Sequence, residues 1–490
     1  MDSLPNYLEA AKPVPKSNRV PWYLSSAQTY AGVMLWFAFW QVIAVGPRIH
    51  EGFDQYSAFA GGVLSHGVLL ALASVVVAAL ICHFLFYLVP GLLGFKSGLP
   101  LYVVGTSTYG AYGGFLMPGF LMGLLQFGWL GVSSYFSAKM LCEPFGYGAG
   151  SFPHAAVAIV WAIAAAVVGL KGIRYVAGVN TFAPIVPLVA LAILTYGTLS
   201  GVANFNPQTA IDAGLKTTIT LKDVAHTQIH ALPALSSWGV FCLIVAYIVG
   251  FFATAGAAGV DFGMNNRNTR DVHLGGLVGI ALATVVSGGL AMLIVAGGLA
   301  LGIGPDKADL QATHMFTGII GSKGSGVMMW LLALAAFPSS CFSSLIAANS
   351  FKTTLPKINP WISVGIGTLG SITLAVTGLA GNVMGVFTVI GASFGPICGA
   401  MAADYLLAGC KWPGPRAGFN PAGWISWAVG FVVGGAGLAA ELIPALKGIV
   451  PEIPCPPVAA FIVGFVLYAV LAKIGIQTRT LKMPQVDQPG

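Results

Sequence analysis

Charged side chains are scarce in this sequence of 490 residues: Asp, Glu, Lys and Arg make up 8% of it, whereas 57% of the residues are hydrophobic. A soluble globular protein carries about 25% charged residues, so this chain lacks the polar groups that a water-exposed surface requires. The composition excludes a soluble enzyme, a nucleic-acid-binding protein and a disordered scaffold. It predicts a multi-pass membrane protein, whose net charge of +7 reflects Lys and Arg in cytoplasmic loops.

Sequence motifs for metal binding, catalysis and nucleotide binding are also missing. The seven cysteines show no C-x-x-C spacing, so neither a zinc site nor a disulfide framework is indicated. The sequence contains no H-E-x-x-H motif, no pair of Asp residues in mid-span and no Gly-rich nucleotide loop followed by Lys. These absences argue against an intramembrane enzyme and against ATP-driven transport, and no cofactor is expected.

Long apolar stretches, in contrast, are abundant. A helix needs about 20 mostly apolar residues to cross the bilayer core, and twelve stretches approach that length. They are Tyr30–Val45, Val63–Val89, Phe115–Ser137, Ala155–Leu170, Val176–Leu199, Trp238–Gly256, Val272–Leu301, Val327–Ala348, Trp361–Ala380, Val383–Leu407, Trp424–Ala440 and Val458–Ala472. The sequence therefore predicts an all-α membrane protein with twelve transmembrane helices, numbered here as spans one to twelve.

Basic residues indicate how the chain is oriented. If the N-terminus is cytoplasmic, 15 of the 22 Lys and Arg residues fall in inner segments and 7 in outer segments. The positive-inside rule then predicts cytoplasmic termini and a location in the plasma (inner) membrane.

The longest polar loop divides the spans, as the midpoint between two inverted repeats does in many transporters. The expected parts are a cytoplasmic tail (1–28), a first repeat with spans one to five (29–200), an outer loop (201–237), a second repeat with spans six to ten (238–410), spans eleven and twelve (411–475) and a cytoplasmic C-terminal tail (476–490).

Span eight is the most informative span by its chemistry. Pro338 removes one helical hydrogen bond and frees a carbonyl, and Ser339 and Ser340 add hydroxyl oxygens at the same level. Unwound transporter helices bind Na⁺ with such oxygens. Alternatively, Pro338 only kinks the helix and the serines hydrogen-bond to their own backbone. The residue types leave both interpretations open.

Ionisable residues within spans are few. Asp261 and Asp404 lie near cytoplasmic ends and precede basic loops, which favours helix capping and loop salt bridges over a transport role. His66 and His83 fall in span two, where they are either a proton relay or packed, hydrogen-bonded residues. No charged pair lies at the membrane centre, which argues against a site for amines or amino acids.

Three motifs carry a resemblance to a known family. They are the run from Gln126 to Gly131 (QFGWLG), the run from Gly250 to Gly256 (GFFATAG) with Asp261-Phe262 behind it, and Gly391–Pro396 (GASFGP) with Asp404-Tyr405 behind it. Together, in these spans of a twelve-span chain, they resemble the nucleobase:cation symporter-1 family. The resemblance extends patchily over roughly residues 32–471.

This resemblance implies a core of five plus five spans in inverted repeats, with spans one and six broken at the midplane and two extra C-terminal helices. It implies a flat heterocycle held between the rings of Trp129 and Phe252, with hydrogen bonds from Gln41 and from the Phe251 backbone. At positions where relatives carry amides, this chain has other polar groups. The expected substrate-binding residues are thus Trp129, Phe252, Phe251, Gln41, Gln126, Ser133, Cys341 and Ser344. The implied sodium ligands are Ala38, Gln41, Ala336, Ser339 and Ser340.

The predicted function is a symporter that imports a nucleobase or related heterocycle, such as cytosine, a purine, uracil or hydantoin, with Na⁺ or H⁺. Its partners would be this small molecule and the lipid bilayer, with no nucleic acid. Stacking rings and amides suffice for a flat, uncharged base. The alternatives are a symporter of the same fold for amino acids or other small solutes, which would contact a carboxylate at a helix break, and a facilitative channel without a cation site.

Overall fold

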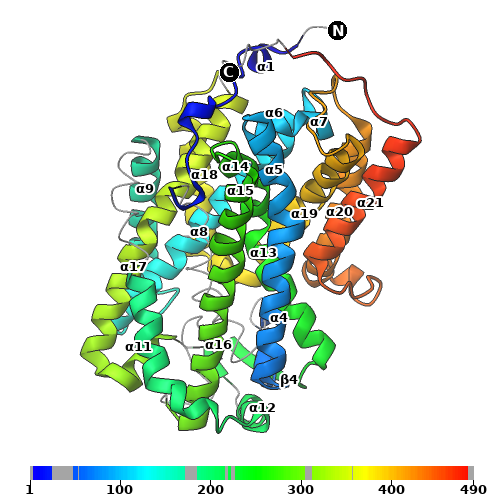
Figure 1. Ribbon diagram of the computed structural model, residues 1–490. Coiled ribbons are helices and arrows are strands. Elements are labelled where there is room, and N and C mark those ends of the chain that lie inside the picture. Colours follow the sequence, from blue (N-terminus) through cyan, green and yellow to red (C-terminus); the bar gives the residue numbers. More distant parts are fainter. Residues whose placement is uncertain are drawn as a thin grey trace.

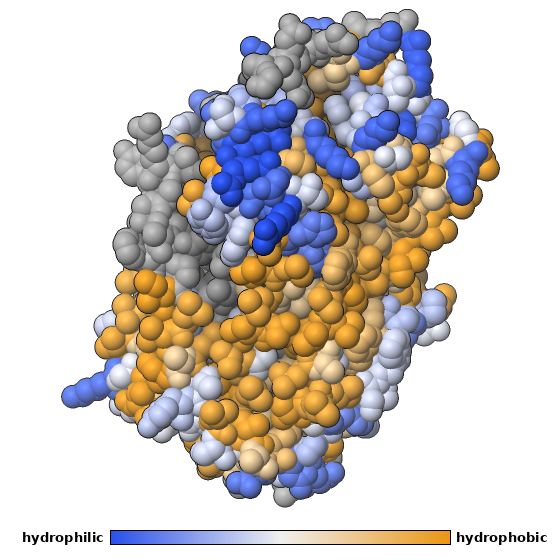
Figure 2. Space-filling view, in the orientation of Figure 1, coloured by the Kyte–Doolittle hydropathy of each residue, from blue (hydrophilic) through white to orange (hydrophobic). Residues whose placement is uncertain are grey.

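Long helices run from one end of the molecule to the other in the computed structural model, which describes residues 4–24, 48–52, 55–171, 185–215, 219–221, 227–303, 312–355 and 357–483 (Figure 1). Ten helical segments among these residues are long and apolar enough to cross a membrane. An apolar belt surrounds the middle of the molecule in the face that Figure 2 shows, and hydrophilic residues gather towards the ends. This distribution fits a bilayer around the belt.

The spanning segments follow the apolar stretches of the sequence. They are α4–η4–α5 (Val68–Ile81, Cys82–Tyr87, Leu88–Ser97), η5–α8–η6 (Phe115–Phe120, Leu121–Cys142, Glu143–Phe145), α9 (Phe152–Lys171), α11 (Ile185–Val202), α13 (Ser237–Ala257), α15–η7–α16 (Thr269–Gly276, Leu277–Leu282, Ala283–Leu301), α17 (Ala312–Thr354), α19 (Val383–Leu407), α20 (Pro421–Leu442) and α21 (Pro456–Lys473). The shorter apolar helix α18 (Pro360–Val376) follows α17. Eleven of the twelve expected spans are confirmed as helices, and span one, Tyr30–Val45, lies outside the described residues.

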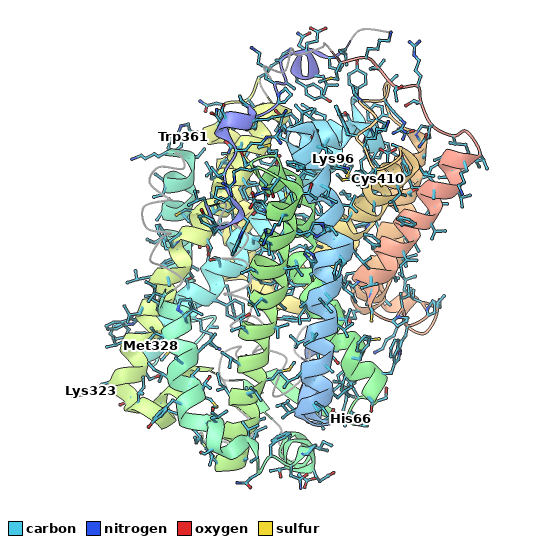
Figure 3. The ribbon with its side chains drawn as sticks, viewed as in Figure 1. His66, Lys96, Lys323, Met328, Trp361 and Cys410 are labelled. Atoms are coloured by element: carbon cyan, nitrogen blue, oxygen red, sulfur yellow. The ribbon has the colours of Figure 1, made fainter. Side chains whose placement is uncertain are left out.

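Short helices lie at one end of the bundle (Figure 1). They are α1 (Asn6–Glu9), α6 (Leu101–Val104), α7 (Thr106–Tyr109) and α14 (Gly259–Gly263). The segment after α21 lies at the same end as α1 (Figure 1), and the Arg479 carbonyl accepts a hydrogen bond from the Ala417 amide there. Lys96 also lies at this end, whereas Lys323 lies at the opposite one (Figure 3). The sequence assigns these two lysines to opposite sides of the membrane, and the structure places them at opposite ends of the bundle.

A four-stranded sheet lies in the loops at the other end. Its strands β1 (Arg48–Gly52), β2 (Gln55–Phe59), β3 (Ile219–Leu221) and β4 (Thr227–Leu232) take the order β1-β2-β4-β3. The β2–β4 pair is parallel, so it ties the segment before α4 to the segment before α13. The expected outer loop also contains the helix α12 (Pro207–Leu215). The architecture is helical, as expected, with this small sheet as an addition.

The expected midplane break in span six is wrong. Helix α13 is continuous from Ser237 to Ala257 and ends only at Ala258, directly before α14. The glycines serve close packing instead: a Cβ on Gly250 would meet the Phe387 carbonyl oxygen at 2.7 Å, and one on Gly256 would meet Phe86 Cβ at 2.8 Å. Small residues allow such close approach of membrane helices, so they do not need to unwind the helix here.

Candidate functional site

Three aromatic rings from three different spans meet in the interior. The Trp129 ring of α8 lies 5.0 Å from the Phe251 ring of α13, edge to face, and 5.2 Å from the Phe387 ring of α19. The rings of Phe251 and Phe387 are 5.3 Å apart. These centroid distances are those of favourable aromatic pairs, and we call Trp129, Phe251 and Phe387 the aromatic cluster.

Local sequence explains how the aromatic cluster forms. Tyr247 and Phe251 are four residues apart on one face of α13, and both contact the Phe387 ring. Gly250 lets the backbone of α19 approach α13. On α8, a Cβ at position 128 would meet only Val386 Cγ1, at 3.9 Å. That is an ordinary van der Waals distance, so the packing of α8 against α19 does not require a glycine at position 128.

The ring that Trp129 contacts on α13 is that of Phe251, whereas the sequence predicted Phe252 as its partner across the substrate. Phe252 is 1% exposed, and the ring that it contacts is Phe251. Consecutive helical residues point about 100° apart, so only one of the two can face α8. The predicted backbone role of Phe251 stays a prediction; this residue lies inside the continuous helix α13, and its side chain faces Trp129.

Two polar side chains, Gln126 and Ser133, lie on the same face of α8 as Trp129. Gln126 is 7% exposed, and its amide Nε2 donates to Met122 Sδ at 3.6 Å. Ser133, one turn beyond Trp129, places its hydroxyl 2.5 Å from the Ser340 hydroxyl of α17. The spacing of positions 126, 129 and 133 puts all three on one face of the helix, so the structure brings the predicted α8 residues together with one predicted sodium ligand.

The expected oxygens of α17 also converge. Ser339 Oγ donates to the Ala336 carbonyl at 2.7 Å, and Ser340 Oγ lies 3.1 Å from the same carbonyl oxygen. The helix remains continuous through Pro338, so of the two interpretations left open by the sequence, the structure shows the one with serines bonded to their own backbone. These three uncharged oxygens are nevertheless the ligand type that Na⁺ requires. Ala38 and Gln41, the other predicted ligands, lie outside the described residues.

Two further predicted substrate residues pack between helices. Cys341 is 1% exposed and belongs to a core cluster with Phe127 and Ala165. Ser344 donates to the Ser340 carbonyl, and its Cβ would lie 2.7 Å from a Cβ built on Gly169 of α9. Both residues therefore lie at contacts between helices.

Sequence reasoning missed two residues of the site. Phe387 completes the aromatic cluster, and Trp161 of α9 donates from Nε1 to Ser340 Oγ at 3.1 Å. Neither lies in a motif of the sequence, and both look like ordinary core aromatics of an apolar helix. Their roles follow only from helix packing.

The two aspartates have the structural roles expected of them. Asp404 forms a buried ion pair with Arg416, at 2.8 Å, and accepts a hydrogen bond from the Tyr468 hydroxyl. Asp261 Oδ1 accepts from the backbone amide of Leu101 at the start of α6. Burial raises the pKa of Asp261 from its ordinary 3.8 to about 6, and the Leu101 hydrogen bond opposes that shift.

The two histidines of interest lie apart. His66 precedes α4 rather than lying within the span, and its ring hydrogen-bonds the Leu235 carbonyl at 2.6 Å. It lies at the end of the molecule opposite to Lys96 (Figure 3). His83 is buried within η4, next to the ring of His273 at 6.3 Å. His66 and His83, the two residues considered for a proton relay, therefore have different neighbours and are not connected by contacts among the described residues.

The sequence is similar to those of known transporters. No family model matches the sequence. Cytosine permease of Escherichia coli strain K12 is 25% identical over 362 residues, which cover 72% of this chain and 75% of that protein. Cytosine permease of Escherichia coli O157:H7 matches with the same identity and coverage. The similarity to this kind of transporter confirms the resemblance seen in the motifs.

Solved structures share the fold. A nucleobase-cation-symport-1 family transporter, solved closed with bromovinylhydantoin bound, aligns with a TM-score of 0.61 and 16% identity over 95% of both chains. A Na⁺-coupled sialic acid symporter aligns at 0.56 with 13% identity, over 98% of this chain and 93% of that one. A manganese transporter of Eremococcus coleocola aligns at 0.53 with 11% identity, over 94% and 98%. Because one fold carries such different cargoes, the substrate must be argued from the site.

Proposed function

Since this chain has the fold of a nucleobase-cation-symport-1 transporter and resembles cytosine permeases in sequence, we propose that it is a secondary transporter, not an enzyme, which carries a nucleobase or related heterocycle with a cation. It is a multi-pass membrane protein, and we place it in the plasma (inner) membrane with both termini cytoplasmic, following the distribution of its Lys and Arg residues. Cytosine is the first substrate to test.

The observation that carries this proposal is the contact between Trp129 and Phe251. A flat heterocycle gains about 1–3 kcal/mol from stacking on one aromatic side chain, and these two rings can each stack on it once they move apart. The neighbouring polar groups, Gln126 and Ser133, carry no charge and suit the donors and acceptors of a base. An unpaired polar group is heavily penalised, so these groups would select among heterocycles.

Na⁺ is the proposed coupling ion, with Ala336, Ser339 and Ser340 supplying oxygens from α17. Support comes from the convergence of these three oxygens and from the Na⁺-coupled symporter of the same fold. No step of the proposal needs a resident metal or an organic cofactor. We include Ala38 and Gln41 as the ligands from span one, on the basis of the sequence resemblance alone.

Uptake of radiolabelled cytosine into proteoliposomes tests the function. An inward Na⁺ gradient should drive accumulation above the external concentration, and unlabelled nucleobases or hydantoins should compete while amino acids should not. Accumulation that follows a pH gradient alone would assign H⁺ as the coupling ion. Flux that only equilibrates, without saturation, would point to a facilitative channel.

A further inference from the structure

One buried hydroxyl connects the two halves of the candidate site. Ser340 is fully buried, and its Oγ has three polar neighbours: the Ser133 hydroxyl at 2.5 Å, the Trp161 indole nitrogen at 3.1 Å and the Ala336 carbonyl at 3.1 Å. These neighbours come from α8, from α9 and from its own helix α17. Ser340 is therefore the point where the proposed ion ligands meet the substrate-facing helix.

The number of protons and lone pairs on Ser340 limits what it can do at one time. A serine hydroxyl has one proton to donate and two lone pairs to accept with. The Trp161 N–H can only donate and the Ala336 carbonyl can only accept. One lone pair of the Ser340 hydroxyl thus accepts the hydrogen bond from Trp161. The single proton of Ser340 can be donated either to the Ala336 carbonyl or to the Ser133 hydroxyl, but not to both.

The two choices leave Ser133 in different states. If Ser340 donates to the Ala336 carbonyl, its second lone pair accepts the Ser133 proton, and Ser133 has no proton left for a substrate. If Ser340 donates to Ser133 instead, its second lone pair is free and the Ser133 proton points elsewhere. The direction of this short chain decides whether Ser133 can be a hydrogen-bond donor.

A cation bound to the oxygens of α17 favours the arrangement in which Ser340 donates to Ser133. A cation held by the Ala336 carbonyl and by Ser340 Oγ needs a free lone pair on the hydroxyl, and it repels a proton aimed at that carbonyl. Ser340 must then donate to Ser133. Ser133 lies one turn after Trp129 on the same face of α8, where its released proton can reach a heterocycle stacked on the indole ring.

We propose that Ser133 and Ser340 form a hydrogen-bond relay that couples the two sites: cation binding turns Ser133 into a donor, which favours a substrate with a hydrogen-bond acceptor at that point. This inference rests on the proposed function and adds Ser133 as the residue that couples ion and substrate. By linkage, the substrate also strengthens cation binding, by the same factor. Ser339 bonds only the Ala336 carbonyl among the contacts of its side chain in the described residues, so it serves as the matched control.

The test measures cytosine affinity of the purified protein in saturating Na⁺ and in choline. Couplings between sites are typically 5- to 150-fold, so we expect wild-type affinity to rise by about that range in Na⁺. In Ser133→Ala this ratio should fall towards one, while stabilisation of the substrate-free protein by Na⁺ persists. Ser133→Thr, which keeps the hydroxyl, should restore the ratio. Ser339→Ala should need more Na⁺ but keep the ratio at saturation.

Any other result contradicts either the relay or the proposed function, depending on which measurement changes. A wild-type ratio in Ser133→Ala would overturn the relay while leaving the substrate and the ion in place. Loss of the Na⁺ stabilisation in Ser133→Ala would assign the residue to the ion site itself and also overturn the relay. Cytosine binding without any Na⁺ dependence in wild type would overturn the relay but not heterocycle binding. Absence of binding for every nucleobase and hydantoin would overturn the proposed function first.

Discussion

The indole ring of Trp129 meets the phenyl ring of Phe251 edge to face, with 5.0 Å between centroids and 81° between ring planes. The two rings touch, so a flat molecule can enter between them only if α8 and α13 shift or the side chains rotate. Phe387 contacts both rings from α19. The aromatic cluster is thus closed on itself in this conformation, and substrate would replace ring–ring contacts by ring–heterocycle contacts.

Removal of the indole ring should weaken substrate binding without loss of the fold. Trp129→Ala deletes a stacking face worth about 1–3 kcal/mol, which corresponds to a loss of affinity of about 5- to 150-fold. Titration of labelled cytosine against the purified variant measures the change. Trp330→Ala is the control, because Trp330 is 38% exposed and stacks on Phe145 instead. Equal affinities in both variants would remove Trp129 from the site.

Substitutions of Phe251 and Phe252 should have different effects, because Phe251 is proposed to bind substrate and Phe252 packs in the core. Phe251→Ala removes the ring that faces Trp129 and should lower cytosine affinity by about tenfold, within the stacking range. Phe252→Leu keeps an apolar side chain in the core, so it should lower the melting temperature slightly and leave the affinity unchanged. The reverse pattern would restore the pairing that the sequence alone suggested.

The serine hydroxyls of α17 should control the response to Na⁺. In Ser339→Ala combined with Ser340→Ala, two proposed ligands are lost, so the Na⁺ concentration for half-maximal uptake should rise about tenfold or more. Ser363→Ala removes a comparable hydroxyl that bonds the Pro360 carbonyl in α18, and it should behave as wild type. An unchanged Na⁺ dependence in the double variant would place the ion elsewhere.

The Asp404–Arg416 pair should contribute strongly to the stability of the fold. Breaking a buried ion pair costs about 3–5 kcal/mol because one charge is left without its partner, so Arg416→Gln should lower the melting temperature strongly. The Arg267–Asp271 pair offers the comparison, since Arg267 is 51% exposed. Exposed pairs contribute about 0–1 kcal/mol, and Arg267→Gln should change the melting temperature little.

Asp261 should make the protein less stable as the pH rises through about 6. Its pKa is raised from 3.8 to about 6 by burial, so between these values the folded state binds more protons than the unfolded state, and stability falls with increasing pH. Asp261→Asn keeps an acceptor for the Leu101 amide but carries no charge. Its melting temperature should exceed that of wild type above pH 6, and its pH dependence between about 4 and 6 should be flatter.

Hydrophobic length and charge predicted the helices well, because the bilayer imposes both. The roles of Asp261 and Asp404 were also predictable, since acids at span ends near basic loops find local partners. The choice between Phe251 and Phe252 was not, because it depends on the rotation of α13 about its axis. Phe387 and Trp161 escaped prediction for a related reason: their contacts arise from the packing of helices that are distant in the sequence.

The most direct test of the account is a thermal-shift panel on the purified protein, with nucleobases, hydantoins and amino acids, each in Na⁺ and in choline. A ligand that binds only the folded state raises the melting temperature by mass action. The account predicts a stabilising heterocycle whose effect is larger in Na⁺ than in choline and is lost in Trp129→Ala. Stabilisation by amino acids alone, or heterocycle stabilisation that persists in Trp129→Ala, would contradict it.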